Sequence, residues 1–171
     1  MSRTIVHVGR KIQVAVEESL DEQGRLVQRD VVLHPGAVAI LPLVDDQQVC
    51  LIRNVRPNVG DTLWEIPAGT LEPSEPPEQA AYRELREETG YEARQMTKLG
   101  EFFPSPGVLS ERTHVYVASG LTPGPPHLQA DEQIEAHVIA LQQAYAWCRD
   151  GTIRDAKTLV ALLWWQTRPR A

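Results

Sequence analysis

The stretch GTLEPSEPPEQAAYRELREETGY occupies residues 69–91 of this 171-residue chain. Its first part, Gly69 to Pro77, is rich in proline and glycine, which predicts a loop. The two prolines that end the loop suit the first turn of a helix, where a missing N–H costs nothing. Gly90 suits the left-handed position that follows a helix. The sequence therefore predicts a loop and then a helix from about Pro77 to Thr89.

Three glutamates of the predicted helix, Glu84, Glu87 and Glu88, are related by i, i+3 and i+4, so they project from one face. Like charges at this spacing destabilise a helix by about 0.2–0.5 kcal/mol per pair, so such a face is either exposed or offset by a cation. We expect an exposed face, and its oxygens suit Mg²⁺ or Mn²⁺ shared with substrate phosphates. The alternative is a solvated acidic helix with Arg83 and Arg86 as local partners.

The residues around these glutamates match a long signature, G-x5-E-x7-R-E-U-x-E-E-x-G-U, where U is bulky and apolar. The matching residues are Gly69, Glu75, Arg83, Glu84, Leu85, Glu87, Glu88, Gly90 and Tyr91. On these residues the chain resembles the Nudix hydrolase superfamily. The resemblance implies an α/β protein, an α/β/α sandwich with a mixed sheet, which hydrolyses a nucleoside diphosphate linked to another group with divalent cations.

The resemblance also implies a metal site and a catalytic set. The implied metal ligands are Ala68 through its backbone carbonyl, Glu84, Glu87, Glu88 and Glu132. Arg83 would join the same glutamates in the catalytic set, and with Glu75 it would hold the loop against the helix. Glu132 would bind metal or act as the catalytic base. The alternative for Glu132 is that it and Asp131 only polarise a turn.

Segments outside the signature resemble the ADP-ribose pyrophosphatase group of this superfamily. Pro106 lies in the sixteenth position after Gly90 (106 − 90 = 16), within a Ser-Pro-Gly run that is followed by Ser-Glu. Further matching segments are QAYAW at 143–147, DGTI at 150–153 and ALLWW at 161–165. The resemblance covers about residues 29–165, nearly the whole chain.

Four residues are carried over from that group as substrate contacts. Arg56 would reach the phosphates, Arg29 would lie near the nucleotide, and Glu65 and Glu111 would border the pocket. An exposed arginine is more often simply solvated, and this alternative holds for both arginines. The chain also departs from the group after Ser-Pro-Gly, where Val-Leu replaces a small polar pair, and at Arg53-Asn54. Both departures concern the fit of the terminal ribose more than the hydrolysis.

The activity implied is Mg²⁺-dependent hydrolysis of the pyrophosphate bond of ADP-ribose to AMP and ribose 5-phosphate, by a water molecule that the metal activates. Mn²⁺ is a possible substitute for Mg²⁺. One alternative is the same chemistry on GDP-mannose, another nucleoside diphosphate sugar or a dinucleoside polyphosphate. A second alternative is a module that binds ADP-ribose without catalysis and regulates a partner. The complete set of signature carboxylates favours an enzyme.

The rest of the chain alternates between strand and helix patterns. Predicted strands cover residues 11–20, 26–33, 36–44, 49–55, 96–103, 112–118 and 133–140, and predicted helices cover 141–149 and 155–167. Asp21 to Gly24 predicts a hairpin turn. We therefore expect two regions: a small β region at 1–35 and the hydrolase domain at 36–171. The resemblance to the ADP-ribose pyrophosphatase group implies a homodimer that exchanges its N-terminal strands, with Arg29 contributing to the partner's active site. The alternative is a hairpin that folds back on its own domain and gives a monomer.

The composition of the chain limits the kinds of partner that we expect it to bind. The net charge of −6 and the pI of about 5.4 exclude a nucleic acid polymer as the expected partner. The sequence has no run of eighteen apolar residues, so it predicts no membrane span, and we see no apolar core of a signal peptide. Cys50 and Cys148 have no metal-ligand spacing and predict reduced thiols. We expect a cytoplasmic protein that acts on a small molecule.

Overall fold

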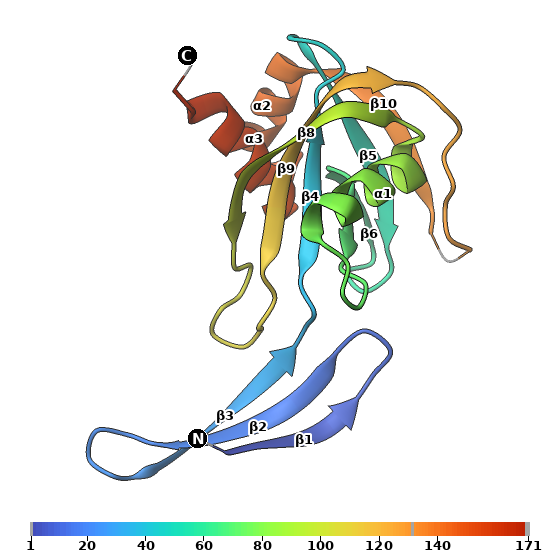
Figure 1. Cartoon of the computed structure of the whole chain (residues 1–171). Coiled ribbons are helices and arrows are strands. Elements are labelled where there is room, and N and C mark those ends of the chain that lie inside the picture. Colours follow the sequence, from blue (N-terminus) through green and yellow to red (C-terminus); the bar gives the residue numbers. More distant parts are fainter. Residues whose placement is uncertain (1, 131, 170–171) are drawn as a thin grey trace.

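The computed structural model describes residues 2–130 and 132–169. Figure 1 shows the course of the chain. The elements in chain order are β1 (Ser2–Val8), β2 (Gln13–Leu20), β3 (Leu26–Leu33), β4 (Ala37–Pro42), β5 (Gln48–Arg56), β6 (Asp61–Glu65), β7 (Ala68–Thr70), α1 (Pro77–Thr89), β8 (Glu92–Phe102), β9 (Thr113–Thr122), β10 (Ile134–Ala140), α2 (Leu141–Asp150) and α3 (Ala156–Thr167).

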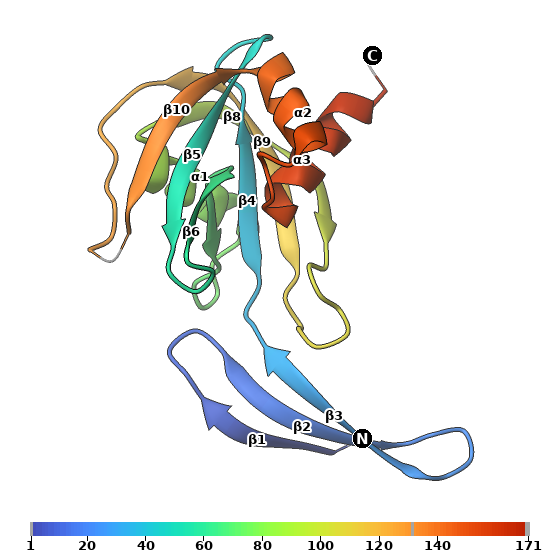
Figure 2. The ribbon, with the colours of Figure 1, turned by 180° about the vertical axis from the view of Figure 1, so that it is seen from behind.

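The strands form three sheets. A four-stranded mixed sheet has the order β7-β4-β9-β8, in which β4 and β9 run parallel and the other neighbours run antiparallel. An antiparallel sheet, β10-β5-β6, lies beside it, and β1-β2-β3 forms a third. Helix α1 covers one face of the mixed sheet, while α2 and α3 cover the other, as the two opposite views show (Figures 1 and 2). The expected α/β/α arrangement is confirmed.

The central strand β4 contributes side chains to both hydrophobic cores, one on each face of the mixed sheet. Successive side chains of a strand point to opposite faces of its sheet. Val38 and Ile40 pack with Leu85 of α1, whereas Ala39 and Leu41 pack in the core that includes residues of α2 and α3. All four β4 side chains are fully buried. A strand with apolar residues on both faces explains the continuous apolar run in the sequence.

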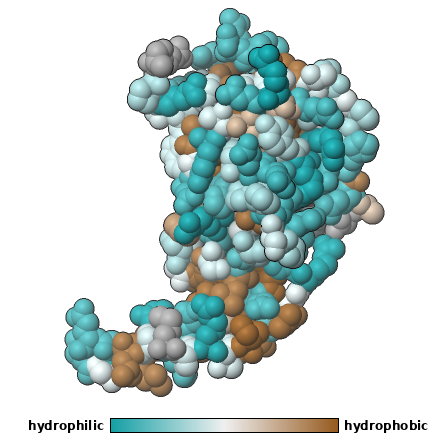
Figure 3. All heavy atoms as spheres, viewed as in Figure 1, coloured by the Kyte–Doolittle hydropathy of each residue, from teal (hydrophilic) through white to brown (hydrophobic). Residues whose placement is uncertain are grey.

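The N-terminal sheet stands apart from the rest of the chain and joins it through the β3–β4 connection (Figure 1). It meets the loop between β8 and β9, where the Val32 N–H donates to the Val108 carbonyl at 2.7 Å and the Ser110 N–H donates to the Val32 carbonyl at 2.9 Å. Much of its apolar surface is open, and Figure 3 shows apolar residues gathered on this part. Its exposed large apolar residues are Ile5, Val6, Val8, Ile12, Leu20 and Leu26.

Several details differ from the sequence expectations. The N-terminal hairpin has a third strand, β1, and two strands in the middle of the chain, β6 and β7, were not predicted. The predicted loop from Gly69 begins inside β7, because Ala68 to Thr70 pair with β4. The predicted turn at Asp21 is confirmed: its carboxylate accepts from the N–H groups of Gln23 and Arg25. In the described part of the chain, no helix is both long and apolar enough to cross a membrane.

Candidate active site

Helix α1 carries the candidate site, and its bounds confirm the prediction. Pro77 occupies the first turn, and Gly90 ends the helix with φ at 75° while its N–H donates to the Arg86 carbonyl at 2.9 Å. A side chain at Gly90 would also overlap the backbone at Gly124. The apolar side of α1, which includes Ala81 and Leu85, packs on the mixed sheet. The rotation of the helix is thereby fixed, and with it the direction of its glutamates.

An arginine bridges the loop and the helix. Arg83 donates from Nε and Nη2 to the two carboxylate oxygens of Glu75, both at 2.8 Å. Its Nη1 donates to Glu84 Oε1 at 2.6 Å and lies 3.4 Å from Glu87 Oε2. Glu75 also accepts from the Glu72 N–H. Because one guanidinium joins the loop to two of the helix carboxylates, Arg83 holds the loop against α1.

The face of α1 that carries the three glutamates was expected to be exposed, but most of it is buried. Glu88 is only 4% exposed and Glu84 is also buried, whereas Glu87 is partly open. Glu88 Oε2 accepts from the Ala68 N–H at 2.9 Å. A Cβ on Gly69 would overlap the Glu84 carboxylate, so only glycine allows β7 to lie this close to the helix. The face is buried because the backbone of β7 lies directly against it.

Burial changes the proton affinity of both glutamates. Burial, together with the charges of Glu84 and Glu132, raises the pKa of Glu88 to about 8, although the Ala68 hydrogen bond and the charge of Lys157 oppose the shift. Burial also raises the pKa of Glu84, although Arg83 lowers it in part. A buried carboxylate without a close cation favours its neutral form. The site is therefore built to receive positive charge.

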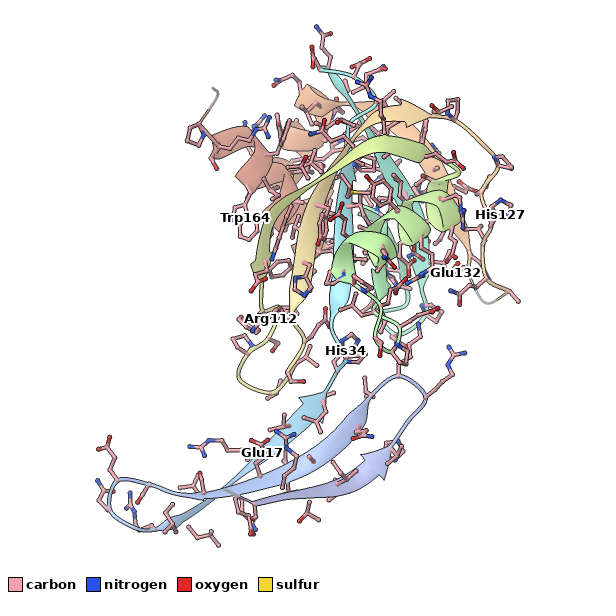
Figure 4. The ribbon with its side chains drawn as sticks, in the orientation of Figure 1. Glu17, His34, Arg112, His127, Glu132 and Trp164 are labelled. Atoms are coloured by element: carbon pink, nitrogen blue, oxygen red, sulfur yellow. The ribbon has the colours of Figure 1, made fainter. Side chains whose placement is uncertain are left out.

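Glu132 lies on the loop before β10, on the same side of the molecule as α1 (Figure 4). Its carboxylate accepts from the Gln129 N–H at 2.8 Å, so it does brace a turn, as the alternative held. Its charge also raises the pKa of Glu84 and of Glu88. A hollow of about 360 Å³ borders it, lined in part by Arg53 and Leu128. The neighbouring Asp131 is outside the described residues.

The residues present fit a divalent cation by the chemistry of their donors. Within residues 2–130 and 132–169, no three acidic, histidine or cysteine side chains are gathered closely enough to hold a metal. The positively charged guanidinium of Arg83 instead takes the place of a metal ion between Glu84 and Glu87. Buried hard oxygen donors with raised pKa suit Mg²⁺ or Mn²⁺. A metal would compete with Arg83 for these carboxylates.

Arg56 and Glu65 form a second charged group close to the first. Arg56 donates from Nε to Glu65 Oε1 at 2.8 Å and from Nη2 to Oε2 at 2.7 Å. Glu65 is 1% exposed, whereas 41% of the Arg56 side chain is exposed. Glu65 was expected to contact the substrate, but the structure buries it beneath Arg56. It therefore supports that arginine instead.

The same network includes residues of α3 that the sequence did not single out. Lys157 Nζ donates to Glu65 Oε2 at 2.6 Å and to Asp155 Oδ1 at 2.7 Å. Asp155 caps α3 by accepting from the Thr158 N–H, and Thr158 Oγ1 accepts from the Ile66 N–H at 2.8 Å. The sequence predicted only the helix over 155–167 and not these contacts, because Glu65 and Lys157 are 92 residues apart.

Two expected substrate contacts lie away from the glutamates in this chain. Arg29 is on β3, in the separate N-terminal sheet, where Nη1 donates to Ser19 Oγ at 2.9 Å. Glu111 accepts from Thr113 Oγ1 at 2.8 Å and lies 3.8 Å from Nδ1 of His34, which is labelled in Figure 4. Arg29 belongs to the N-terminal sheet, and Glu111 lies at the junction of that sheet with β4. The structure does not bring either one to the α1 glutamates.

Comparisons with known proteins identify the family of the chain. A family model described as "NUDIX domain" matches residues 33–162. An "ADP-ribose pyrophosphatase" of Bacillus subtilis is 37% identical over 94% of this chain and 88% of its own length. A "Methanol dehydrogenase activator" of Bacillus methanolicus is 36% identical over 92% and 86%.

A solved structure titled "Crystal structure of ADP compounds hydrolase" shares the fold. It superposes with a TM-score of 0.85, covering 97% of this chain and 90% of that one, at 24% sequence identity. The family model spans the mixed sheet, α1 and the start of α3, which are the elements that build the site. The chain therefore belongs to the NUDIX family and is an enzyme of that family.

Proposed function

We propose that this enzyme hydrolyses the pyrophosphate bond of ADP-ribose to AMP and ribose 5-phosphate with Mg²⁺, for which Mn²⁺ can substitute. The observation that carries the proposal is the pair of buried carboxylates, Glu84 and Glu88, packed against β7: Glu84 pairs with Arg83, and Glu88 accepts from the backbone N–H of Ala68. Such a site takes a divalent cation together with substrate phosphates. The Bacillus subtilis relative supports ADP-ribose as the substrate, since its printed name is ADP-ribose pyrophosphatase.

The metal would be held by the carbonyl of Ala68 and by Glu84, Glu87, Glu88 and Glu132. When bound, a divalent cation neutralises phosphate charge and lowers the pKa of an attacking water. Arg56, with its partly exposed guanidinium, would bind the diphosphate beside these carboxylates. Glu132 or a helix glutamate would accept the proton of the water that attacks one phosphorus, and the bridging P–O bond would break. One water is consumed, so the products balance.

A substrate panel tests this proposal. ADP-ribose and GDP-mannose are incubated with Mg²⁺, with Mn²⁺ and with a chelator, and the products are identified by phosphorus NMR. We expect AMP and ribose 5-phosphate from ADP-ribose and no reaction with the chelator. The same reaction in ¹⁸O-labelled water shows which phosphorus is attacked. Faster cleavage of GDP-mannose would contradict ADP-ribose as the substrate while leaving the chemistry intact.

We also propose that residues 1–35 form a dimerisation region and that residues 36–171 form the hydrolase domain. The N-terminal sheet buries little of its apolar surface against its own chain, and its most exposed large residues include Val8 and Leu20. A small sheet without a covered face is marginal in water. A second copy of the chain would cover it and bring Arg29 of one subunit to the active site of the other.

Light scattering across a dilution series, on the full chain and on a variant lacking residues 1–35, tests the assembly. We expect a dimer that the shortened chain cannot form, with weaker ADP-ribose binding. The substitution Arg29→Ala should weaken binding without changing the dimer. A monomeric full chain, or unchanged affinity in the shortened chain, would rule out this role.

A further inference from the structure

The carboxylate of Glu65 has two cationic partners, one of which has no role in the site described so far. Arg56 bonds both of its oxygens, and Lys157 bonds Oε2 as well. Glu65 is 1% exposed, so this charge has almost no contact with solvent. A buried charge needs close partners to remain ionised. Arg56 meets this need only in part, since 41% of its side chain is exposed.

The two arginine bonds leave part of the guanidinium directed elsewhere. A guanidinium carries five N–H donors in a rigid plane. The bonds to Glu65 use Nε and Nη2, so the two N–H groups of Nη1 point away from that carboxylate. This is the geometry needed to bind a phosphate oxygen while the other edge is fixed. The position of Glu65 therefore sets the direction of the free donors of Arg56.

Lys157 fixes the position of Glu65, although the two residues are far apart in the sequence. Its ammonium lies 2.6 Å from Glu65 Oε2 and 2.7 Å from Asp155 Oδ1, with 19% of the side chain exposed. Asp155 is itself held at the start of α3, where it accepts from the N–H of Thr158. Thr158 bonds the backbone of Ile66, next to Glu65. The start of α3 is thus attached to both residues of this corner.

We propose that Lys157 is a positioning residue for diphosphate binding: it anchors the buried Glu65 carboxylate to α3 so that Arg56 presents its free donors to the substrate. The inference rests on the proposed function only in taking the ligand to be a diphosphate. Burial would by itself raise the pKa of Glu65, but the bonds from Arg56 and the charge of Lys157 lower it overall. The carboxylate therefore keeps the charge that both partners need.

The test measures binding without hydrolysis, by titrating ADP in the presence of Mg²⁺ in a calorimeter. Lys157→Met keeps most of the aliphatic stem and removes the charge. We expect its affinity for ADP to fall about tenfold, the value of one charge-assisted hydrogen bond. Lys157→Arg should restore most of the affinity. Lys98→Met is the matched control, since Lys98 pairs with Glu101 on β8 and should leave ADP affinity unchanged.

A double substitution separates positioning from a general effect on the fold. In an Arg56→Ala background, Lys157→Met should have no further effect on ADP affinity, because the proposed effect of Lys157 on ADP passes through Arg56. Equal losses in both backgrounds would overturn the inference. So would unchanged ADP affinity in Lys157→Met, or a higher Mg²⁺ requirement in place of weaker ADP binding. Native protein that binds ADP but does not cleave ADP-ribose would contradict the proposed function alone.

Discussion

Glu65 and Glu88 are buried to a similar degree, at 1% and 4% exposed, but their charges are balanced differently. Glu65 has two cations at hydrogen-bond distance, Arg56 and Lys157, and its pKa is lowered although burial opposes this. Glu88 has one backbone N–H, and burial raises its pKa to about 8. The difference separates a carboxylate that completes the fold from one that waits for a cation. It also predicts opposite results when either charge is removed.

The largest effect is expected from Glu88→Gln on turnover. This change removes a metal charge but keeps the shape of the side chain, so we expect kcat to fall about a thousandfold, as when one essential electrostatic partner is lost. Without metal, its melting temperature should stay the same or rise, because a neutral amide replaces a carboxyl group whose charged form is costly to bury. Undiminished kcat at saturating Mg²⁺ would show that Glu88 is not a required ligand.

Glu65→Gln should mainly lower stability, and it should also weaken ADP binding because Glu65 orients Arg56. The amide would remove the carboxylate that Arg56 and Lys157 share, leaving Asp155 as a charged partner of Lys157, and would weaken the contact between α3 and β6. Breaking a buried pair by removing one partner costs about 3 kcal/mol. For a chain of this size the melting temperature should fall by about 6–12 °C. An unchanged melting temperature would show that the network adds nothing to stability.

Substitution of a third carboxylate, Glu132, tests whether the site on α1 extends to the loop before β10. If it accepts the proton of the attacking water, Glu132→Gln should lower kcat about a hundredfold and change KM little. Gln129→Ala is a useful control, because it alters the same turn but keeps the backbone N–H that Glu132 bonds. A large rise in KM with kcat intact would instead make Glu132 a binding contact and leave the base on α1.

The sequence predicted the local features of the site well. Helix α1 has the expected bounds because its signals, Pro77 and Gly90, act within the segment itself. The Glu75–Arg83 pair was also expected, since a signature of fixed spacing relates the two. The α/β architecture followed from alternating strand and helix patterns. These are properties that neighbouring residues decide.

The sequence did not predict what distant segments contribute. The burial of Glu88 depends on β7, whose three residues are too few to show a strand pattern. Lys157 joins the site through a contact 92 residues away in sequence, and its own surroundings resemble any capped helix. Glu65 was placed near the pocket, but a single acidic residue carries no signal of whether it faces a ligand or a lysine. Tertiary packing decides each of these points.

The smallest expected effect is a difference in pH dependence. Glu88 has a pKa of about 8 in the folded state, above the value of about 4.3 for an unfolded chain. Its contribution to stability is therefore fully present below about pH 4.3 and is lost as pH rises through 8. Linkage limits this loss to about 1.4 kcal/mol per pH unit for one proton. Glu65, whose pKa is lowered, contributes stability above that unfolded value and loses it only in acid.

Thermal melts in a chelator at pH 6, 7 and 8 check this difference. We expect the native protein to become less stable over this range, Glu88→Gln to show a weaker decline, and Glu65→Gln to keep the native slope at lower stability. The histidines are the same in all three proteins, so the difference between the native protein and Glu88→Gln isolates one carboxylate. Equal slopes would mean that Glu88 is already ionised without metal. Saturating Mg²⁺ should remove the slope from the native protein, because a bound cation favours the charged form.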